Sequence, residues 1–194
     1  QLEIFADADA DCSGSPPADP PERDLELTYA DNVVKSESDQ GQTQDGSKID
    51  QVRSESKNAT GNNEDFFSLG FKTDGSGGFE EDGGQLTVEF DQEDELVKRG
   101  FGTDVVGIET TNNPSDYPEE KALVEVAGPG TNGNFVEVGT ATSKASNGEN
   151  TFELPGEPIR RVRLTDQTDP SNFDDSPDAD GFEVKAIKGY TESS

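Results

Sequence analysis

The chain has 194 residues, of which 43 are Asp or Glu and 15 are Lys or Arg, and its formal net charge at pH 7 is −28. A charge of this sign and size repels nucleic acids and anionic membrane surfaces, so the composition excludes both as partners. The chain contains no His, which excludes catalytic dyads and triads with an imidazole base, and its single cysteine, Cys12, excludes an internal disulfide and a thiolate zinc site.

The low hydrophobic content, 28%, together with the high net charge is also typical of disordered chains. The apolar residues are nevertheless grouped in short alternating runs, which favours a folded chain. In about 1 M salt the screening length falls to roughly 3 Å, so surface acids no longer oppose the compact state. We therefore interpret the sequence as a single domain adapted to molar salt or to divalent cations.

The N-terminal residues 1–11 are predicted to form a strand, because apolar and acidic residues alternate along them. Glu3, Asp7 and Asp9 occupy one side. The small or apolar residues on the other side are Leu2, Ile4, Ala6, Ala8 and Ala10. Residues 12–23 contain four prolines, which favour an extended linker over a sheet interior, and residues 24–194 are predicted to form the body.

The body shows no sustained helical period and many short alternating segments separated by Gly, Asn, Asp and Pro. The predicted strands are 25–30, 33–34, 66–69, 85–90, 104–109, 122–126, 135–138, 151–154, 159–164 and 182–187, with a short helix around 49–52. This pattern predicts an all-β fold, an antiparallel sandwich or jelly roll, that carries an additional N-terminal strand.

Six parts of the body, in this order, resemble the motifs of calcium-associated jelly-roll modules of bacterial and archaeal cell-surface proteins. They are YADNVV at 29–34, FSLG with GGQLTVEF at 67–70 and 83–90, GTDVVGIE at 102–109, ALVEV with FVEVG at 122–126 and 135–139, RVRLTD at 161–166, and DGFEVKAI at 180–187. The resemblance covers roughly residues 28–190. Glu183 and Lys185 stand where the family has Asp.

The resemblance implies a jelly-roll fold, calcium and a cell-surface location, and it implies no reaction. We expect an extracellular protein whose signal peptide has been removed, in a haloarchaeal type of acidic sequence. Because this setting permits glycosylation, Asn58 in Asn58-Ala59-Thr60 is a candidate acceptor.

Hard cations suit the acidic loop at 166–180, which holds six aspartates between two predicted strands. Calcium takes six to eight oxygen ligands, and a bound ion would neutralise this loop. The family motif marks the strand at 104–109, so Asp104 and Glu109 at its two ends are also candidate ligands. The candidate calcium ligands are Asp104, Glu109, Asp166, Asp178, Asp180 and Glu183. The alternative is a solvated acidic loop of a salt-adapted protein; the spacing does not match an EF-hand.

Catalysis is not indicated, because the abundance of acids means that no carboxylate pair stands out, and we expect no enzyme. Binding of surface glycans needs exposed aromatic side chains. The chain has no Trp and three Tyr, and Tyr117, in a loop bounded by prolines, is the best sugar platform.

The N-terminal strand gives the main functional hypothesis. A twelve-residue linker at about 3.1 Å per residue reaches about 37 Å, which is comparable to the diameter of a body with a radius of gyration near ~16 Å. Strand 2–10 can therefore pair with another copy and build a homopolymer, such as a surface filament, sheath or matrix. The alternatives are a strand folded back on its own body and an adhesion or carbohydrate-binding module. Cys12 remains a free thiol or an intermolecular crosslink.

We expect cooperative folding in molar NaCl or KCl and loss of structure on dialysis to low salt, because the −28 charge then repels itself without screening. Circular dichroism and thermal melts across a salt series measure this dependence. Full retention of the β-sheet signal and of thermal stability in salt-free buffer would contradict it.

Overall fold

The computed structural model describes residues 25–61, 65–76, 78–91, 95–96, 107–109, 117–173 and 175–192. These residues form an antiparallel all-β fold, as the sequence predicts, and their helices are short 3-10 turns. The strands are β1 Leu25–Tyr29, β2 Asn32–Val33, β3 Phe67–Ser68, β4 Gln85–Glu89, β5 Gly107–Glu109, β6 Lys121–Ala127, β7 Val136–Thr142, β8 Glu149–Asn150, β9 Arg161–Asp166, β10 Glu183–Val184 and β11 Ala186–Glu192. The turns are η1 Lys35–Glu37, η2 Gln51–Ser54, η3 Ser56–Ala59, η5 Pro129–Thr131, η6 Ser146–Gly148 and η7 Pro170–Phe173.

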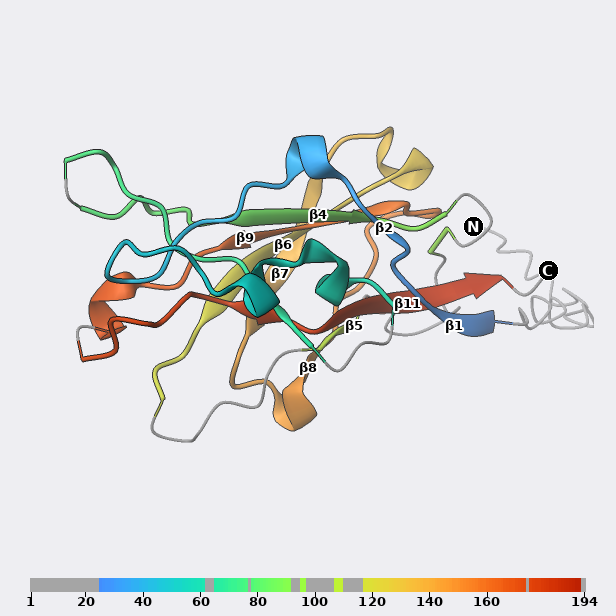
Figure 1. The fold of residues 1–194 in the computed structure, drawn as a ribbon. Helices are drawn as coiled ribbons and strands as arrows, with labels where there is room; N and C mark the ends of the chain where they lie inside the picture. Colours follow the sequence, from blue (N-terminus) through green and yellow to red (C-terminus); the bar gives the residue numbers. More distant parts are fainter. Residues whose placement is uncertain are drawn as a thin grey trace, which may run out of the picture.

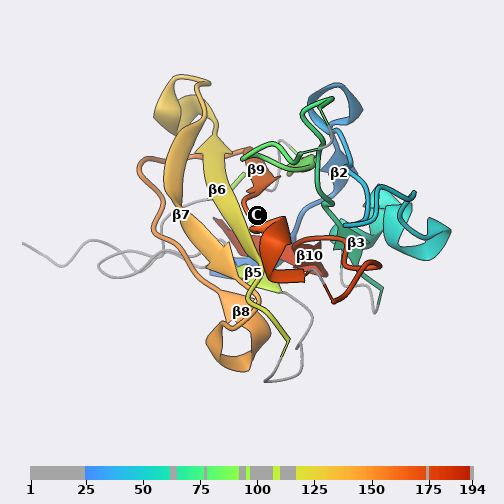
Figure 2. The ribbon, with the colours of Figure 1, turned by 90° about the vertical axis from the view of Figure 1, so that its left-hand side faces the viewer.

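Two main sheets make the body (Figure 1). One has five strands in the order β2-β4-β9-β6-β7, and the other has four strands in the order β1-β11-β5-β8. The strands β10 and β3 form a separate two-stranded sheet. In the end-on view of Figure 2, β6 and β7 lie above β5 and β8, as expected for a sandwich of two layers. The finer jelly-roll assignment stays a prediction.

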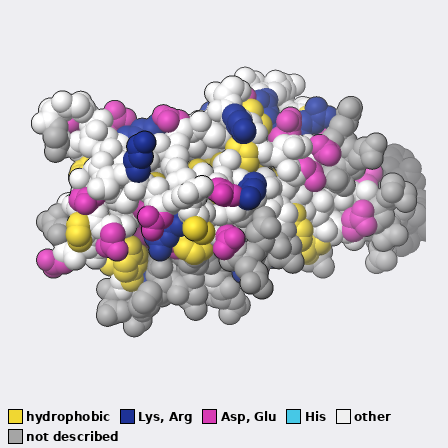
Figure 3. Space-filling view, viewed as in Figure 1, with side chains coloured by type: hydrophobic (Ala, Val, Ile, Leu, Met, Phe, Trp, Pro, Cys, Tyr) yellow, Lys and Arg dark blue, Asp and Glu magenta, His cyan; other side chains and the backbone are white. Residues whose placement is uncertain are grey.

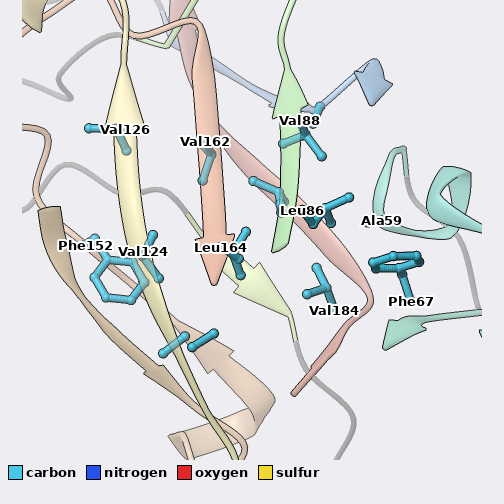
Figure 4. Close-up of a cluster of buried hydrophobic side chains, with 14 of the residues drawn as sticks. Ala59, Phe67, Leu86, Val88, Val124, Val126, Phe152, Val162, Leu164 and Val184 are labelled. Atoms are coloured by element: carbon cyan, nitrogen blue, oxygen red, sulfur yellow. The ribbon is translucent and has the colours of Figure 1, made fainter. Parts of the chain in front are cut away.

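The core lies between these layers and is supplied by alternate positions of the central strands. Leu86 and Val88 on β4, Val162 and Leu164 on β9, and Val124 and Val126 on β6 are all fully buried. Figure 4 shows these side chains converging with Phe67, Phe152 and Val184. The period-two pattern of 85–90, 122–126 and 159–164 thus identifies both the strands and the buried face.

The outer face of the five-stranded sheet is stabilised by the few cations of the chain. Arg161 pairs with Glu37 at 2.8 Å, and Arg163 pairs with Glu125 at 2.7 Å. The guanidinium of Arg163 lies 3.8 Å from the centre of the Phe135 ring, at cation–π distance. In Figure 3, acidic and basic side chains are interspersed on the visible face.

Three predicted elements differ in detail. The single strand expected at 182–187 is two strands, because the chain passes from the β10-β3 pair to the four-stranded sheet at Lys185. No strand forms at 151–154, although Phe152 and Leu154 are buried there; the paired residues are Glu149 and Asn150. The expected helix around 49–52 is the 3-10 turn η2.

Asn150 connects the two main sheets at this point. Its backbone pairs with Ile108 of β5, while its side chain accepts a hydrogen bond from the Thr142 amide at 2.8 Å and donates to the Thr142 carbonyl at 3.1 Å. The Asn150 side chain thereby occupies both backbone groups of Thr142 on the outer edge of β7, as a neighbouring strand would.

The N-terminal strand and its apolar face, from Leu2 to Ala10, lie outside the described residues, as do the linker and Cys12. The first described residue, Leu25, pairs with Glu192 near the end of the chain. Figure 1 shows β1 at the right-hand end of the molecule and the turn η7, with the acidic loop, at the opposite end.

Candidate functional site

The sequence places a buried carboxylate at the point where β9 ends. Asp166 is 0% exposed, and its carboxylate accepts the Thr168 amide at 2.7 Å and the Phe182 amide at 2.5 Å. These bonds fix both ends of the acidic loop, because Thr168 begins the loop and Phe182 ends it. Gly181 makes the approach possible: its φ is +72°, and a Cβ there would lie 2.2 Å from Asp166 Oδ2.

A single guanidinium serves the next two acids. Arg53, from η2, donates from Nη1 to both carboxylate oxygens of Asp180, at 3.0 and 2.9 Å, and lies 3.6 Å from Glu183 Oε1. The Asp180 and Glu183 side chains are buried, whereas Arg53 is 40% exposed. Its guanidinium also lies 5.1 Å from the centre of the Phe66 ring. Arg53 therefore covers two buried carboxylates from the solvent side.

Burial and the charge of Asp180 favour the protonated forms of Asp166 and Glu183. Burial, with the negative charge of Asp180, raises the pKa of Asp166 to about 7, against the opposing effect of its two backbone hydrogen bonds. Burial and the same Asp180 charge raise the pKa of Glu183 to about 7, against the attraction of Arg53. Two carboxyl groups at this end of the sandwich thus titrate near neutrality.

Tyr117 and Glu120 extend the acidic group toward the start of β6. The Glu120 side chain is buried, and its backbone N–H donates to Ser143 Oγ at 3.0 Å. Burial raises the pKa of Tyr117, as do the charges of Glu120, Asp180 and Glu183. We call Glu120, Asp166, Asp180 and Glu183 the acidic cluster.

Beside the cluster lies a small second core. Phe71 and Phe173 are buried, with ring centres 6.1 Å apart, and Phe79 packs edge-on against Phe71 at 5.7 Å. The Tyr117 ring packs edge-on against Phe173 at 5.4 Å and is half-buried. The described contacts of Tyr117 are therefore those of a packed residue, and its role as a sugar platform stays a prediction.

The six candidate calcium ligands do not all meet. Asp166, Asp180 and Glu183 lie in the acidic cluster, whereas Asp178 is exposed. Glu109 lies in β5, and the structure describes only its backbone. Asp104 also lies outside the described residues. Within the described part of the chain, no group of three or more acids is arranged to hold a metal ion.

Arg53 competes with calcium for two of the candidate ligands. It already supplies a positive charge to Asp180 and Glu183, so these two acids fit a calcium ion only if the guanidinium moves away. Beside Arg53, a polar depression of about 310 Å³ is lined by Asp178 and Asp180 together with Asp45 and Asp50. Calcium binding at this end of the molecule stays a prediction.

Asn58 has a structural role that the sequence does not reveal. It is 5% exposed, and its Nδ2 donates to the carbonyls of Val52 at 2.7 Å and Phe66 at 3.2 Å. An N-linked glycan is attached through this same nitrogen, so attachment requires the loss of both bonds and exposure of the amide. The structure therefore disfavours a glycan on the folded chain.

Sequence reasoning missed Arg53 and Glu120. Arg53 and Asp180 are 127 residues apart, and no local spacing links them. Glu120 follows Glu119 and precedes Lys121, a charged run typical of a solvated surface, yet its side chain is buried. Only the three-dimensional arrangement identifies these residues.

Comparison of the chain with models of protein families, with curated proteins and with solved structures finds no match. The resemblance to calcium-associated surface modules therefore stays a prediction. Among the helices in the described segments, none is long and apolar enough to cross a lipid bilayer.

We expect stability to fall as the pH rises from about 4 to about 7, because a carboxyl group whose pKa is raised by folding holds its proton more tightly in the folded state. For Asp166, with a pKa near 7, the effect is about 4 kcal/mol at most, at about 1.4 kcal/mol per pKa unit. Asp166→Asn should remove the Asp166 part of this dependence and leave the part due to Glu183. It should lower stability most at low pH, since an amide accepts only one of the two N–H bonds.

Urea unfolding at fixed molar salt between pH 4 and 8 measures this effect. Asp169→Asn is the control: Ser171 lowers the pKa of this exposed acid, so its charge is constant from pH 5 to 8. A wild-type curve as flat as that of Asp166→Asn would contradict the prediction.

We expect calcium to raise the melting temperature relative to a chelator at fixed ionic strength, because a ligand of the folded state stabilises it. Arg53→Gln should lower the unfolding free energy by about 2 kcal/mol, less than for a fully buried pair because Arg53 is partly exposed. It should also enlarge the calcium effect, since Asp180 and Glu183 lose their competing cation.

Differential scanning calorimetry with calcium or chelator measures both effects. Arg160→Gln is the matched control, because Arg160 pairs with Glu95 outside the acidic cluster. Identical melting temperatures with calcium and chelator in wild type and in Arg53→Gln would count against a calcium site here.

Proposed function

We propose that this protein is a non-catalytic, secreted structural subunit of a surface filament, sheath or matrix of a salt-loving microbe. Copies join head to tail when the N-terminal strand of one subunit pairs with the next, and calcium and high salt stabilise the assembly. The observation that supports this proposal most is the position of β1. Among the described strands it is the outermost of its sheet, and it begins at Leu25, so the preceding segment enters the body at this edge.

This position suits strand exchange for a physical reason. A segment that enters at an interior strand is enclosed by its own sheet, whereas a segment that enters at an edge is free to reach a neighbour. The linker at 12–23 reaches about 37 Å at about 3.1 Å per residue, which is enough to span one body. Burial of Leu2 and Ile4 on the neighbour contributes about 1.5–3 kcal/mol each, before the ordering of the segment is subtracted.

The described chemistry also agrees with a structural role. The buried carboxylate of Asp166 binds two backbone amides, and that of Asp180 binds Arg53. These partners give both groups a role in joining loops to strands. An acid engaged in this way is poorly placed to attack or protonate a substrate.

Binding of surface glycans is the second candidate. A groove of about 540 Å³ at the loop end is lined by Phe79, by the polar residues Gln44, Gln167 and Thr168, and by the acids Glu80, Glu81 and Asp169. An aromatic ring with amide and hydroxyl groups around it is suited to a sugar.

Electron microscopy of the full chain in molar salt tests the proposal. Wild type should form regular fibres, whereas deletion of residues 1–11 should leave a folded monomer, and Ile4→Asp should do nearly the same because it places a charge in an apolar contact. Fibres that persist unchanged after the deletion would contradict strand exchange. Selective binding on a glycan array without fibres would favour the second candidate.

A further inference from the structure

Within the described part of the chain, no strand lies on the outer edge of β1. Among the described residues β1 pairs with β11 alone, in a regular antiparallel register from Leu25 opposite Glu192 to Tyr29 opposite Lys188. Just beyond the strand, the Ala30 N–H donates to the Ile187 carbonyl at 2.8 Å. Because N–H directions alternate along a strand, those of Leu25, Leu27 and Tyr29 point to the open side.

The apolar side chains of β1 lie on the outer face of the sheet. In β11 it is Gly189 that faces the core, since a Cβ there would lie 2.6 Å from Leu96 Cδ2. Thr28 is opposite Gly189 and shares its inner face. Leu25, Leu27 and Tyr29 therefore project outward on the same face as Tyr190, and Leu27 is 48% exposed. An edge strand with outward apolar side chains offers a partner both unpaired backbone groups and an apolar contact surface.

The other described sheet edges suit a partner less well. β2, β3, β8 and β10 each have two residues. β7 is longer, but its pairing with β6 has an irregularity between Val124 and Glu125, and the Asn150 side chain already binds the Thr142 backbone on its outer edge. Bulges and covering side chains of this kind prevent strand addition. β1 has neither feature among the described residues.

We propose that the open edge of β1 is the acceptor for residues 2–10 of a second copy, with Leu2 and Ile4 beside Leu25 and Leu27 on the outer face. This inference rests on the proposed strand exchange and adds its receiving surface. The occupant fits for two reasons: its apolar residues alternate as those of β1 do, and the undescribed 24-residue segment that contains it is joined to the start of β1 itself. Main-chain pairing supplies affinity, and the alternate side chains supply the register.

This placement also explains a need for salt. If Leu2 and Ile4 share the outer face with Leu27, then Glu3, Asp7 and Asp9 lie on the face of Glu26, and like charges on neighbouring strands repel. Glu26→Lys should therefore shift fibre formation to a lower salt concentration. An unchanged salt midpoint would contradict this placement of the two faces.

Proline substitution tests the edge itself in the full chain at molar salt. Leu27→Pro removes an outward N–H and leaves the bonds to β11 in place, so it should fold and slow fibre growth at least about tenfold, as expected when main-chain bonds to the partner are lost. Leu27→Ser keeps the N–H and should have a smaller effect. The matched control is Thr140→Pro on β7, whose N–H points to the outer edge as that of Thr142 does, and it should not affect growth.

The outcomes separate this inference from the proposed function. If Thr140→Pro stops fibres and Leu27→Pro does not, the acceptor is β7; strand exchange survives and this inference fails. If deletion of residues 1–11 stops fibres but neither proline does, edge addition is wrong for both strands. If the deletion itself has no effect, strand exchange fails with it.

Disulfide crosslinking keeps the test decisive if Leu27→Pro does not fold. In a Cys12→Ser background, one tagged chain carries Ile4→Cys and a second, untagged chain carries Leu27→Cys. Mixed in salt and oxidised, they should give a disulfide between the two chains. A third chain carries both Ile4→Cys and Leu27→Cys. If a disulfide forms only within this chain, the strand folds back on its own β1 and the proposal is overturned.

Discussion

The arrangement of the loop end depends on the buried carboxylate of Asp166. A charged group is costly to bury, and this one is tolerated because the amides of Thr168 and Phe182 donate to it. Since those amides belong to the two ends of the acidic loop, one side chain fixes where the loop leaves β9 and where it returns to β10. The positions of Asp180 and Glu183 follow from that return, and so does their contact with Arg53.

Acids have two opposite roles in this chain. On the surface they are hydrated and repel one another over distances that salt shortens. In the acidic cluster they are removed from water, and Asp166 and Glu183 have pKa values near 7. For Asp166 burial outweighs its hydrogen bonds, and for Glu183 burial outweighs the attraction of Arg53. Salt therefore acts mainly on the surface acids, and pH near neutrality acts mainly on the buried ones, so the two variables probe different parts of the fold.

Sequence periodicity predicts most of the sheets, because a strand between two layers must alternate. The runs at 85–90, 122–126 and 159–164 show both the strands and their buried faces. Periodicity fails where a strand changes sheets, as at Lys185, and where a segment such as Phe152 supplies core without pairing. The candidate site was predicted in part: Asp166, Asp180 and Glu183 come together, but the cation beside Asp180 and Glu183 is Arg53, 127 residues from Asp180. No local pattern encodes a contact of that separation.

The edge strand β1 links fold and assembly through the same principle of alternation. A strand at the edge of a closed monomer normally turns its apolar side chains inward, yet on β1 Thr28 faces inward and Leu27 outward. Inversion of this kind leaves Leu27 exposed on the monomer and gives any added strand an apolar neighbour. Because the inward face of β1 also carries Glu26, the proposed addition at this edge meets the same repulsion between acids that we expect to oppose folding at low salt. The two proposals therefore share one electrostatic condition: we expect the salt that stabilises the monomer to permit extension of its edge as well.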